Sequence, residues 1–337
     1  MARVAVLSST YLPSPPPSYG GLEYVAYLHA LGLSELGHDV TLYAAPNPAA
    51  RYPFRLAELP QAPEGSLDRS LLSDLASYDA VIDESHAHLW GGICIYHDYA
   101  PRLGERCEVH VAVSEHHAWA LSSLYGVRFL YAYDPVDASW ARPAPRKERL
   151  VVWYGRMNKG ANEFLRLLRL WEVRADVAVV GDDSTMGEED VREARRLAEA
   201  LGAQYYGLVE DRREVGRILG RAAVVASAFH PLYREAFGMW AVEAIAAGAL
   251  PLAPQESVRE IARYVVREGR WEHYLLARYD TDYATLRSLL LEALDRAEAG
   301  ERVVNERDAE LFSYRRVAER FLSPILEGYL TSHSRVS

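Results

Sequence analysis

The feature that most constrains the fold is an alternation of strand and helix patterns, which occurs twice along the 337-residue chain. The first series begins with a predicted strand at Arg3–Ser8 and a helix at Leu22–Leu36, and the second begins with Val151–Tyr154 and Ala161–Leu170. Strands that alternate with helices predict a parallel sheet with helical crossovers. The segment Asp134–Arg149 contains three prolines and no apolar period, so it is predicted to link two α/β domains.

The same alternation predicts the other elements. Expected strands lie at 39–44, 80–82, 93–96, 109–113, 129–132, 177–180, 204–206, 224–226 and 250–252, and expected helices lie at 188–201, 235–247, 283–297 and from Ser114 onward. The tail at 307–330 is predicted as an amphipathic helix that is interrupted near Pro324. We therefore expect a first domain at 1–140, a second at 141–306 and a C-terminal helical segment at 307–337.

Charge is unevenly divided between these domains. The chain is 50% hydrophobic, which is enough for two cores, and its net charge is −10, which argues against nucleic acid or anionic lipid as a partner. Residues 1–140 hold seven arginines, no lysine and sixteen carboxylates, whereas residues 141–337 are nearly neutral. A site for a phosphorylated ligand is therefore expected in the second domain.

Residue usage gives further expectations about the protein's environment. Cys94 and Cys107 are too few for a metal cluster or a disulfide framework and are expected to be buried thiols in a reducing compartment. The N-terminus is interpreted as a first strand and not as a signal peptide, and the sequence has no membrane-spanning apolar stretch. We expect a soluble cytoplasmic protein.

All but two of the 37 basic residues are arginines, and few amides are present, which suggests a thermophilic source.

The strongest local signal is a pair of acids, Glu235 and Glu243, in the Ala-rich segment that ends at Pro251. On a helix, eight residues are just over two turns, so both carboxylates would share one face. An acid inside a helix that is otherwise apolar needs a partner. The alternative is a capping acid followed by a surface acid.

A second signal follows the predicted strand Val151–Tyr154. Arg156 and Lys159 alternate with glycines just before a predicted helix, where free N–H groups and the helix dipole favour a phosphate. Taken alone, this could also be an ordinary turn between a strand and a helix. Lys159 is one of two lysines in the chain, so it stands out from the general surface charge.

A third signal opens the first helix, where Gly20 and Gly21 precede Glu23. Glycines there would let a ligand approach the backbone. The Gly-x-Gly-x-x-Gly fingerprint of dinucleotide-binding proteins is absent, so a Rossmann dehydrogenase is disfavoured.

In this order, the motifs resemble the GT-B glycosyltransferases, and among them the large retaining group numbered family four. The resemblance covers nearly the whole chain and includes Gly37–Val40, Val180–Asp182 and the tail Tyr314–Phe321. It implies two Rossmann-like, doubly wound parallel-sheet domains with a C-terminal helix that crosses back to the first. It also implies a nucleotide-diphosphate sugar as donor, a hydroxyl acceptor at the first domain, and no cofactor or metal.

The resemblance also assigns roles to residues. Arg156 and Lys159 would hold the donor pyrophosphate, Glu243 the ribose, and Glu235 the sugar and its phosphate. The other donor-binding residues implied are Gly20, Gly21, Val209, His230, Ala236, Phe237 and Gly238. His230 could equally be a loop histidine. Asp280 and Asp282 look like a metal-binding pair, but they directly precede a helix, so we expect capping and no metal.

The histidines of the first domain follow predicted strands. His97 matches the family's strand-end histidine beside the reacting sugar and is the expected catalytic residue of this domain. His86 and His88 are possible cleft residues, and either could be the family's match; their spacing could suggest a metal, but no third ligand is spaced to support one. His116 and His117 are interpreted as helix-surface residues.

Two departures from the family's pattern concern the donor. Arg156 and Lys159 are three residues apart where the family has about five, and the segment after Pro251 contains Gln255 where the family has a glycine-rich turn. These departures bear on the donor contacts. The resemblance still implies a retaining, metal-independent glycosyltransferase, and the acidic first domain favours a neutral sugar or small hydroxyl compound as its acceptor. The alternatives are a phosphorylase, a nucleotide-sugar epimerase and a non-catalytic binding module.

Overall fold

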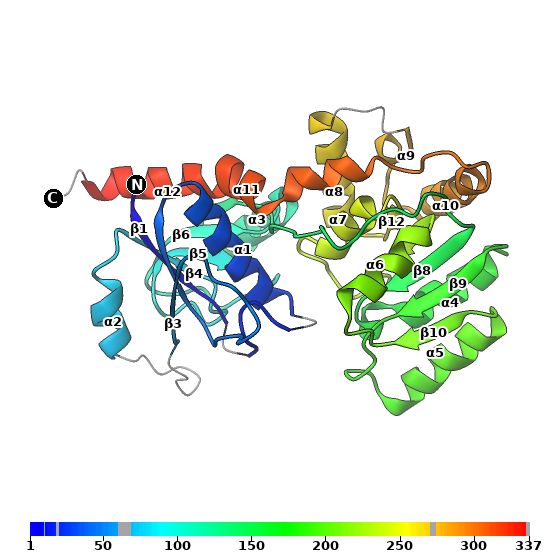
Figure 1. Ribbon diagram of the computed structural model, residues 1–337, viewed down its shortest axis with the longest axis horizontal. Coiled ribbons are helices and arrows are strands. Elements are labelled where there is room, and N and C mark those ends of the chain that lie inside the picture. The colour runs from blue at the N-terminus through cyan, green and yellow to red at the C-terminus, as the bar shows by residue number, and fades with distance from the viewer. Residues whose placement is uncertain (10, 18–19, 60–68, 270–273, 335–337) are drawn as a thin grey trace. The chain divides into compact units, whose positions relative to one another are not determined.

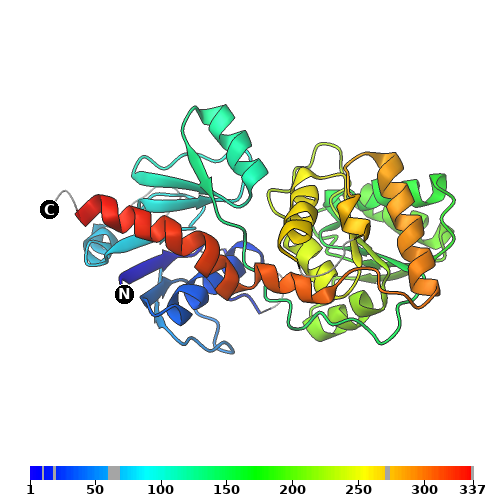
Figure 2. The ribbon, with the colours of Figure 1, turned by 90° about the horizontal axis from the view of Figure 1, so that it is seen from above.

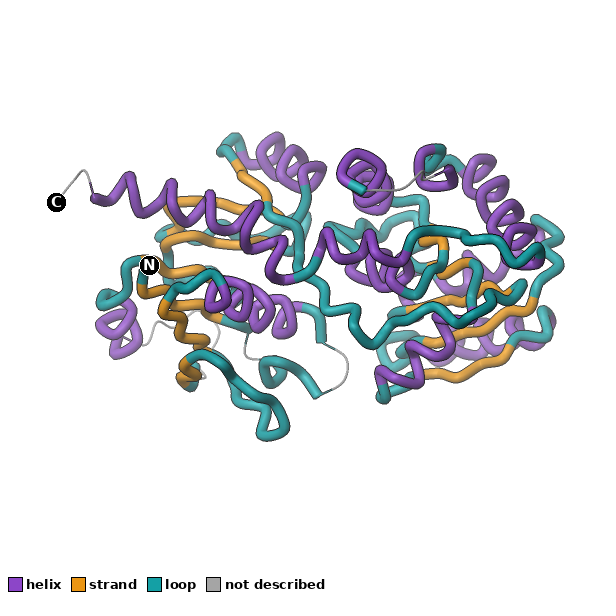
Figure 3. The backbone as a smooth tube through the Cα atoms, turned by 45° about the horizontal axis from the view of Figure 1, so that its top comes forward, coloured by secondary structure: helices purple, strands orange, loops and turns teal. Residues whose placement is uncertain are grey.

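The computed structural model describes residues 1–334 except 10, 18–19, 60–68 and 270–273. The chain forms two compact units (Figure 1). Unit 1 comprises Met1–Asp137 and Phe312–Ser337, and unit 2 comprises Ala138–Leu311. Both units are α/β, as the alternation in the sequence predicts, and in Figure 3 each contains a run of strands flanked by helices.

Unit 1 is built on a seven-stranded parallel sheet in the order β3-β2-β1-β4-β5-β6-β7. Its strands are β1 (Arg3–Leu7), β2 (Asp39–Tyr43), β3 (Arg55–Ala57), β4 (Ala80–Asp83), β5 (Gly92–Tyr96), β6 (Cys107–Ala112) and β7 (Phe129–Tyr131). Strand β5 is buried along its whole length, as expected for a central strand covered on both faces.

The helices of unit 1 include the end of the chain. They are α1 (Leu22–Glu35), α2 (Arg69–Leu75), α3 (Glu115–Tyr125), α11 (Tyr314–Val317) and α12 (Ser323–Ser334). α11 packs against α1, and a Cβ on Gly32 would come within 2.6 Å of the Tyr314 carbonyl oxygen. Figure 2 shows α11 and α12 lying along unit 1.

The tail differs in detail from the expected helix. The segment Glu306–Phe312 is a 3₁₀ helix (η2), and the helix proper begins at Tyr314. A π-helical turn at Ala318–Leu322 (η3) ends two residues before Pro324, so the irregularity lies just ahead of the proline, which lacks the N–H that would continue the helix.

Unit 2 contains a five-stranded parallel sheet in the order β10-β9-β8-β11-β12. Its strands are β8 (Leu150–Tyr154), β9 (Asp176–Val180), β10 (Gln204–Gly207), β11 (Val224–Ala226) and β12 (Leu250–Leu252). Its helices are η1 (Met157–Lys159), α4 (Ala161–Leu170), α5 (Glu188–Ala200), α6 (Arg212–Arg221), α7 (Met239–Ala246), α8 (Glu256–Glu268), α9 (Tyr274–Ala277) and α10 (Tyr283–Glu298). Among the described residues, no helix combines the length and apolar character needed to cross a bilayer.

The expectation of two free thiols is wrong. Cys94 on β5 and Cys107 on β6 form a disulfide, with Cα atoms 5.7 Å apart. The two strands are neighbours in the sheet, and this places the side chains within bonding distance although 13 residues separate them in the chain.

Candidate functional site

Each sheet has one point where the strand order reverses, and ligands of open α/β sheets bind there, beyond the carboxyl ends of the strands. In unit 2 this point lies between β8 and β11. Arg156 and Lys159 follow β8, and the loop that carries His230 and Glu235 follows β11. The structure therefore brings together the residues of two separate sequence signals.

Lys159 and Glu235 form an ion pair at this edge. The Lys159 Nζ lies 2.9 Å from Glu235 Oε2, and the two side chains are 15% and 12% exposed. The ammonium also lies 4.9 Å from the centre of the Tyr233 ring, and the Tyr233 hydroxyl donates to Glu235 at 3.4 Å. A charge pair of this kind is largely removed from water, so its field on a bound ligand is only weakly screened.

Glycines set the backbone around Lys159. Gly155 and Gly160 have φ values of 125° and 110°, which favour glycine. A Cβ on Gly160 would lie 2.0 Å from the His230 backbone nitrogen, which itself donates to the Lys159 carbonyl at 2.8 Å. This close contact between the turn after β8 and the loop after β11 fixes the backbone position of Lys159.

Gln255 binds the backbone of the Glu235 loop, a role that was not predicted from the sequence. Its Oε1 accepts from the Glu235 N–H at 3.2 Å, and its Nε2 donates to the carbonyls of Ala228 and Tyr233 at 2.9 and 3.0 Å. The side chain is buried. The sequence signal is an amide three residues after β12, where the family that the chain resembles has glycines.

The expectation that Glu235 and Glu243 share a helix face is wrong. Helix α7 begins at Met239, after Gly238, whose φ of 87° stops a right-handed helix from extending back to Glu235. Glu235 lies in the preceding loop, and Glu243 is half-buried on α7. The spacing of eight residues therefore does not describe their geometry.

The remaining residues predicted for the donor lie around this edge of unit 2 or at the start of α1. Arg156 is exposed, Ala236 and Phe237 are buried, and Val209 is half-buried in the loop after β10. Gly21 directly precedes α1, and Gly20 packs against Pro16. Asp282 caps α10 by accepting from the Thr285 N–H at 2.8 Å, as expected.

In unit 1 the strand order reverses between β1 and β4, and a cluster of charged side chains lies there. Glu84 follows β4, and its Oε1 is 2.9 Å from Nδ1 of His29 on α1; both side chains are 1% exposed. His97 follows β5, with Nε2 3.7 Å from Glu84 Oε2 and Nδ1 3.6 Å from Asp134 Oδ1. His97 thus lies at a strand end, between two carboxylates.

Opposite charges shift the pKa values of this cluster. Burial alone would raise the pKa of Glu84, but His29 and His97 lower it to about 2. Burial alone would lower the pKa of His97, but Asp134 and Glu84 raise it to about 10. The two carboxylates therefore favour the protonated form of His97.

His86, His88 and His117 each have a different contact partner. His86 Nε2 pairs with Asp98 Oδ2 at 3.0 Å on a part-exposed loop. His88 is buried against the Tyr96 ring, with centroids 4.1 Å apart, and burial lowers its pKa to about 3. The expectation of a surface His117 is wrong: Ser114 caps α3 as expected, but the His117 ring turns inward and contacts the Asp98 carbonyl at 2.9 Å.

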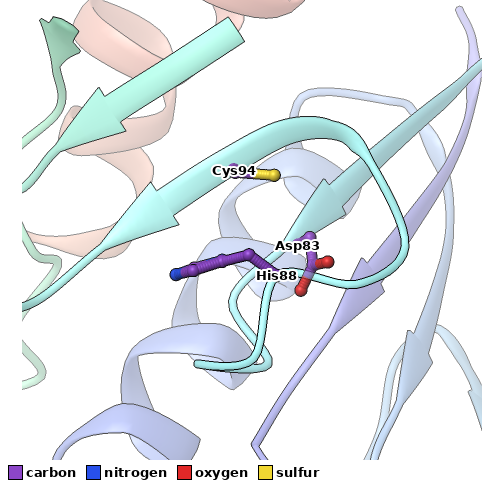
Figure 4. A group of neighbouring side chains, drawn as sticks. All are labelled: Asp83, His88 and Cys94. Atoms are coloured by element: carbon purple, nitrogen blue, oxygen red, sulfur yellow. The ribbon is translucent and has the colours of Figure 1, made fainter. Parts of the chain in front are cut away.

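One group of described side chains has potential metal ligands close together: Asp83, His88 and Cys94, with ligand atoms within 4.8 Å of one another (Figure 4). The Cys94 sulfur is bonded to Cys107 and is not a thiolate. Asp83 already accepts from the backbone N–H groups of Ser85 and Trp90, at 2.9 and 3.0 Å. These bonds give Asp83 a structural role in closing the loop after β4, and the group does not fit a metal.

No family model and no curated protein matches the sequence. Solved structures do match. AviGT4, a glycosyltransferase involved in avilamycin A biosynthesis, is 20% identical with a TM-score of 0.66, over 98% of this chain and 99% of that one. The catalytic domain of Arabidopsis thaliana starch synthase IV, bound to ADP and acarbose, is 11% identical with a TM-score of 0.64, over 98% of both chains. The chain has the GT-B fold.

The GT-B fold also occurs in enzymes of another class. UDP-GlcNAc 2-epimerase from Neisseria meningitidis, solved with UDP-GlcNAc, is 11% identical with a TM-score of 0.52, over 96% of this chain and 100% of that one. At these identities the likeness establishes the fold, and the function must be argued from the site.

Proposed function

We propose that the protein is a retaining glycosyltransferase that moves a sugar from a nucleotide-diphosphate sugar to a hydroxyl acceptor without a metal. The observation that carries the proposal is the shielded pair of Lys159 and Glu235 at the switch point of unit 2. Glycosyl transfer leaves negative charge on the departing diphosphate and positive charge on the sugar. A fixed cation and a fixed carboxylate at one strand edge suit both charges.

In this proposal, Lys159 and Arg156 contact the diphosphate and stabilise the leaving group. Glu235 exchanges part of its ion pair for contacts with the sugar, while Glu243 on α7 meets the ribose. Because the cations come from side chains, the transfer would not need a divalent ion to neutralise the phosphates.

The acceptor is proposed to bind unit 1 and to be neutral. Residues 1–140 carry a net charge of −9, which disfavours an anionic compound or a lipid phosphate. Tight association with anionic vesicles at physiological salt would contradict this part of the proposal.

The first experiment is a thermal-shift panel with UDP, GDP, ADP and their common sugars, because a bound ligand raises the apparent stability. Release of nucleoside diphosphate is then measured for the wild type and for Lys159→Ala and Glu235→Ala. Each substitution is expected to lower kcat by ~10²–10³, the usual cost of losing one preorganised charge. Unchanged turnover in both variants would refute the site.

Arg221→Ala is the matched control. Arg221 forms an ion pair with Glu148 at 2.7 Å in the same unit, but this pair is largely exposed and lies outside the proposed site. Its loss is expected to leave kcat unchanged, because exposed pairs contribute little. The anomeric configuration of the product, read by NMR, tests retention.

The same assay separates the alternatives. An epimerase would convert the nucleotide sugar without an acceptor, a phosphorylase would require inorganic phosphate, and a binding module would show a thermal shift without turnover. The fold of the Neisseria epimerase is the reason to include the first of these controls.

A further inference from the structure

The histidine cluster of unit 1 presents an electrostatic problem that the proposed transfer does not explain. Four of its buried side-chain atoms, Glu84 Oε2, His97 Nε2, Asp134 Oδ1 and His29 Nε2, have no hydrogen-bond partner among the described residues. Burying charged groups is costly unless they are paired. The arrangement therefore calls for an explanation beyond packing.

The directions of the two ring nitrogens of His97 supply an explanation for this cluster. Nε2 faces the Glu84 carboxylate at 3.7 Å, and Nδ1 faces the Asp134 carboxylate at 3.6 Å. A neutral imidazole carries one N–H and one lone pair, so one of its nitrogens would point a lone pair at an anionic oxygen. With both nitrogens protonated, both contacts are attractive.

Glu84 has a defined place in this arrangement. It is 1% exposed, and its other oxygen contacts His29 at 2.9 Å, so the carboxylate is held between α1 and the end of β4. His97 is 11% exposed, which leaves part of the ring accessible at the strand edge.

We propose that Glu84 is a positioning residue: together with Asp134 it fixes His97 as an imidazolium, so that His97 meets a substrate as a fixed positive charge and not as a base. The catalytic consequence rests on the proposed function. The protonation state of the ring does not, because it can be measured without substrate.

Other titratable groups also act on His97. Besides Glu84 and Asp134, the nearby groups are His88 in the loop after β4, Asp98 directly after His97, and His117 on α3. His88 and His117 are neutral at pH 7, since burial lowers their pKa values to about 3 and about 4. The carboxylates therefore dominate the field at the ring.

The test is NMR of the histidine ring nitrogens in the full chain, with His97→Gln to assign the signal. In the wild type, both nitrogens of His97 are expected to stay protonated from pH 6 to above pH 8, in line with its pKa of about 10. In Glu84→Gln, the pKa of His97 is expected to fall below its wild-type value, because one of the two adjacent charges is gone. A wild-type His97 that titrates near its ordinary pKa of 6.5 would overturn the inference.

His117→Gln is the matched control, because it removes another buried histidine from the same sheet edge without touching Glu84. His97 is expected to stay an imidazolium in this variant. If both variants deprotonate His97 equally, Glu84 has only a general structural role. Should Glu84→Gln fail to fold, Asp134→Asn removes the other carboxylate and carries the same expectation.

The turnover assay tests the catalytic consequence of the proposal. If the nucleotide-sugar reaction is present, kcat of Glu84→Gln is expected to decrease with rising pH across the new pKa of His97, while KM for the donor changes little. A kcat that rises with pH there would assign His97 as a base and overturn the catalytic part. A protein that turns over no nucleotide sugar would refute the proposed function and leave the NMR result to decide the protonation state.

Discussion

At the scale of single residues, Gln255 connects the end of β12 to the loop that carries Glu235. Its three hydrogen bonds involve the backbone of Glu235, Ala228 and Tyr233. Gln255→Ala leaves the part-buried Glu235 N–H, the buried Ala228 carbonyl and the part-buried Tyr233 carbonyl without that partner, so we expect the free energy of unfolding to fall by about 1–3 kcal/mol. Chemical denaturation measures this effect, and kcat is expected to fall as well because the Glu235 loop loses a support.

Gln204→Ala is the control for this prediction, because Gln204 is an exposed amide on β10 of the same unit. It is expected to change stability by less than about 0.5 kcal/mol. Equal effects of the two substitutions would mean that the hydrogen bonds of Gln255 do not contribute to the free energy of unfolding.

The sequence could not reveal this role, since the three partners of Gln255 lie 20 to 27 residues away and meet it only through the packing of β11 and β12.

At the scale of elements, the turn between β8 and α4 depends on the missing side chain of Gly160. Gly160→Ala forces a Cβ into a left-handed conformation and to within 2.0 Å of the His230 nitrogen. Gly202→Ala is the matched variant, because its φ of 64° is also positive but nothing lies within 4 Å of the added Cβ. We expect Gly202→Ala to cost about 1–2 kcal/mol from backbone strain, and Gly160→Ala to cost clearly more. Thermal unfolding of the two variants makes the comparison, and equal losses would contradict it.

The same turn shows how much the sequence could predict. The order of most strands and helices and the cationic turn at Lys159 follow from local patterns, because periodicity and glycines are local signals. The prediction of one helix over both Glu235 and Glu243 is wrong because Gly238 is left-handed and the helix begins only after it, although the apolar pattern is continuous. The partners of Glu84 and of Cys94 belong to other elements of the sheet, so only the assembled topology brings them together.

At the scale of the whole molecule, buried titratable groups in unit 1 predict how stability varies with pH. His88 and His117 have folded pKa values of about 3 and about 4, below the 6.5 of an unfolded histidine, and Glu84 has about 2, below 4.5. In each case the unfolded chain binds protons first as the pH falls. Stability is therefore lost below pH 6.5 through the histidines, by up to about 1.4 kcal/mol per pH unit for each, and below pH 4.5 also through Glu84.

His97 acts in the opposite direction, since its raised pKa of about 10 gives stability that is present below pH 6.5 and is lost as the pH rises toward 10. Lys147 acts against His97 above pH 7, because burial lowers its pKa to about 7 and its contribution to stability rises with pH. Stability is therefore expected to fall below pH 6.5 and to change little between pH 7 and pH 10, and guanidinium unfolding at a series of pH values tests this. His117→Gln removes one acid-sensitive group, so its stability should fall less steeply between pH 6.5 and pH 4 than that of the wild type. An identical slope in that window would mean that His117 is already protonated in the folded protein, and that its contact with the Asp98 carbonyl outweighs its burial.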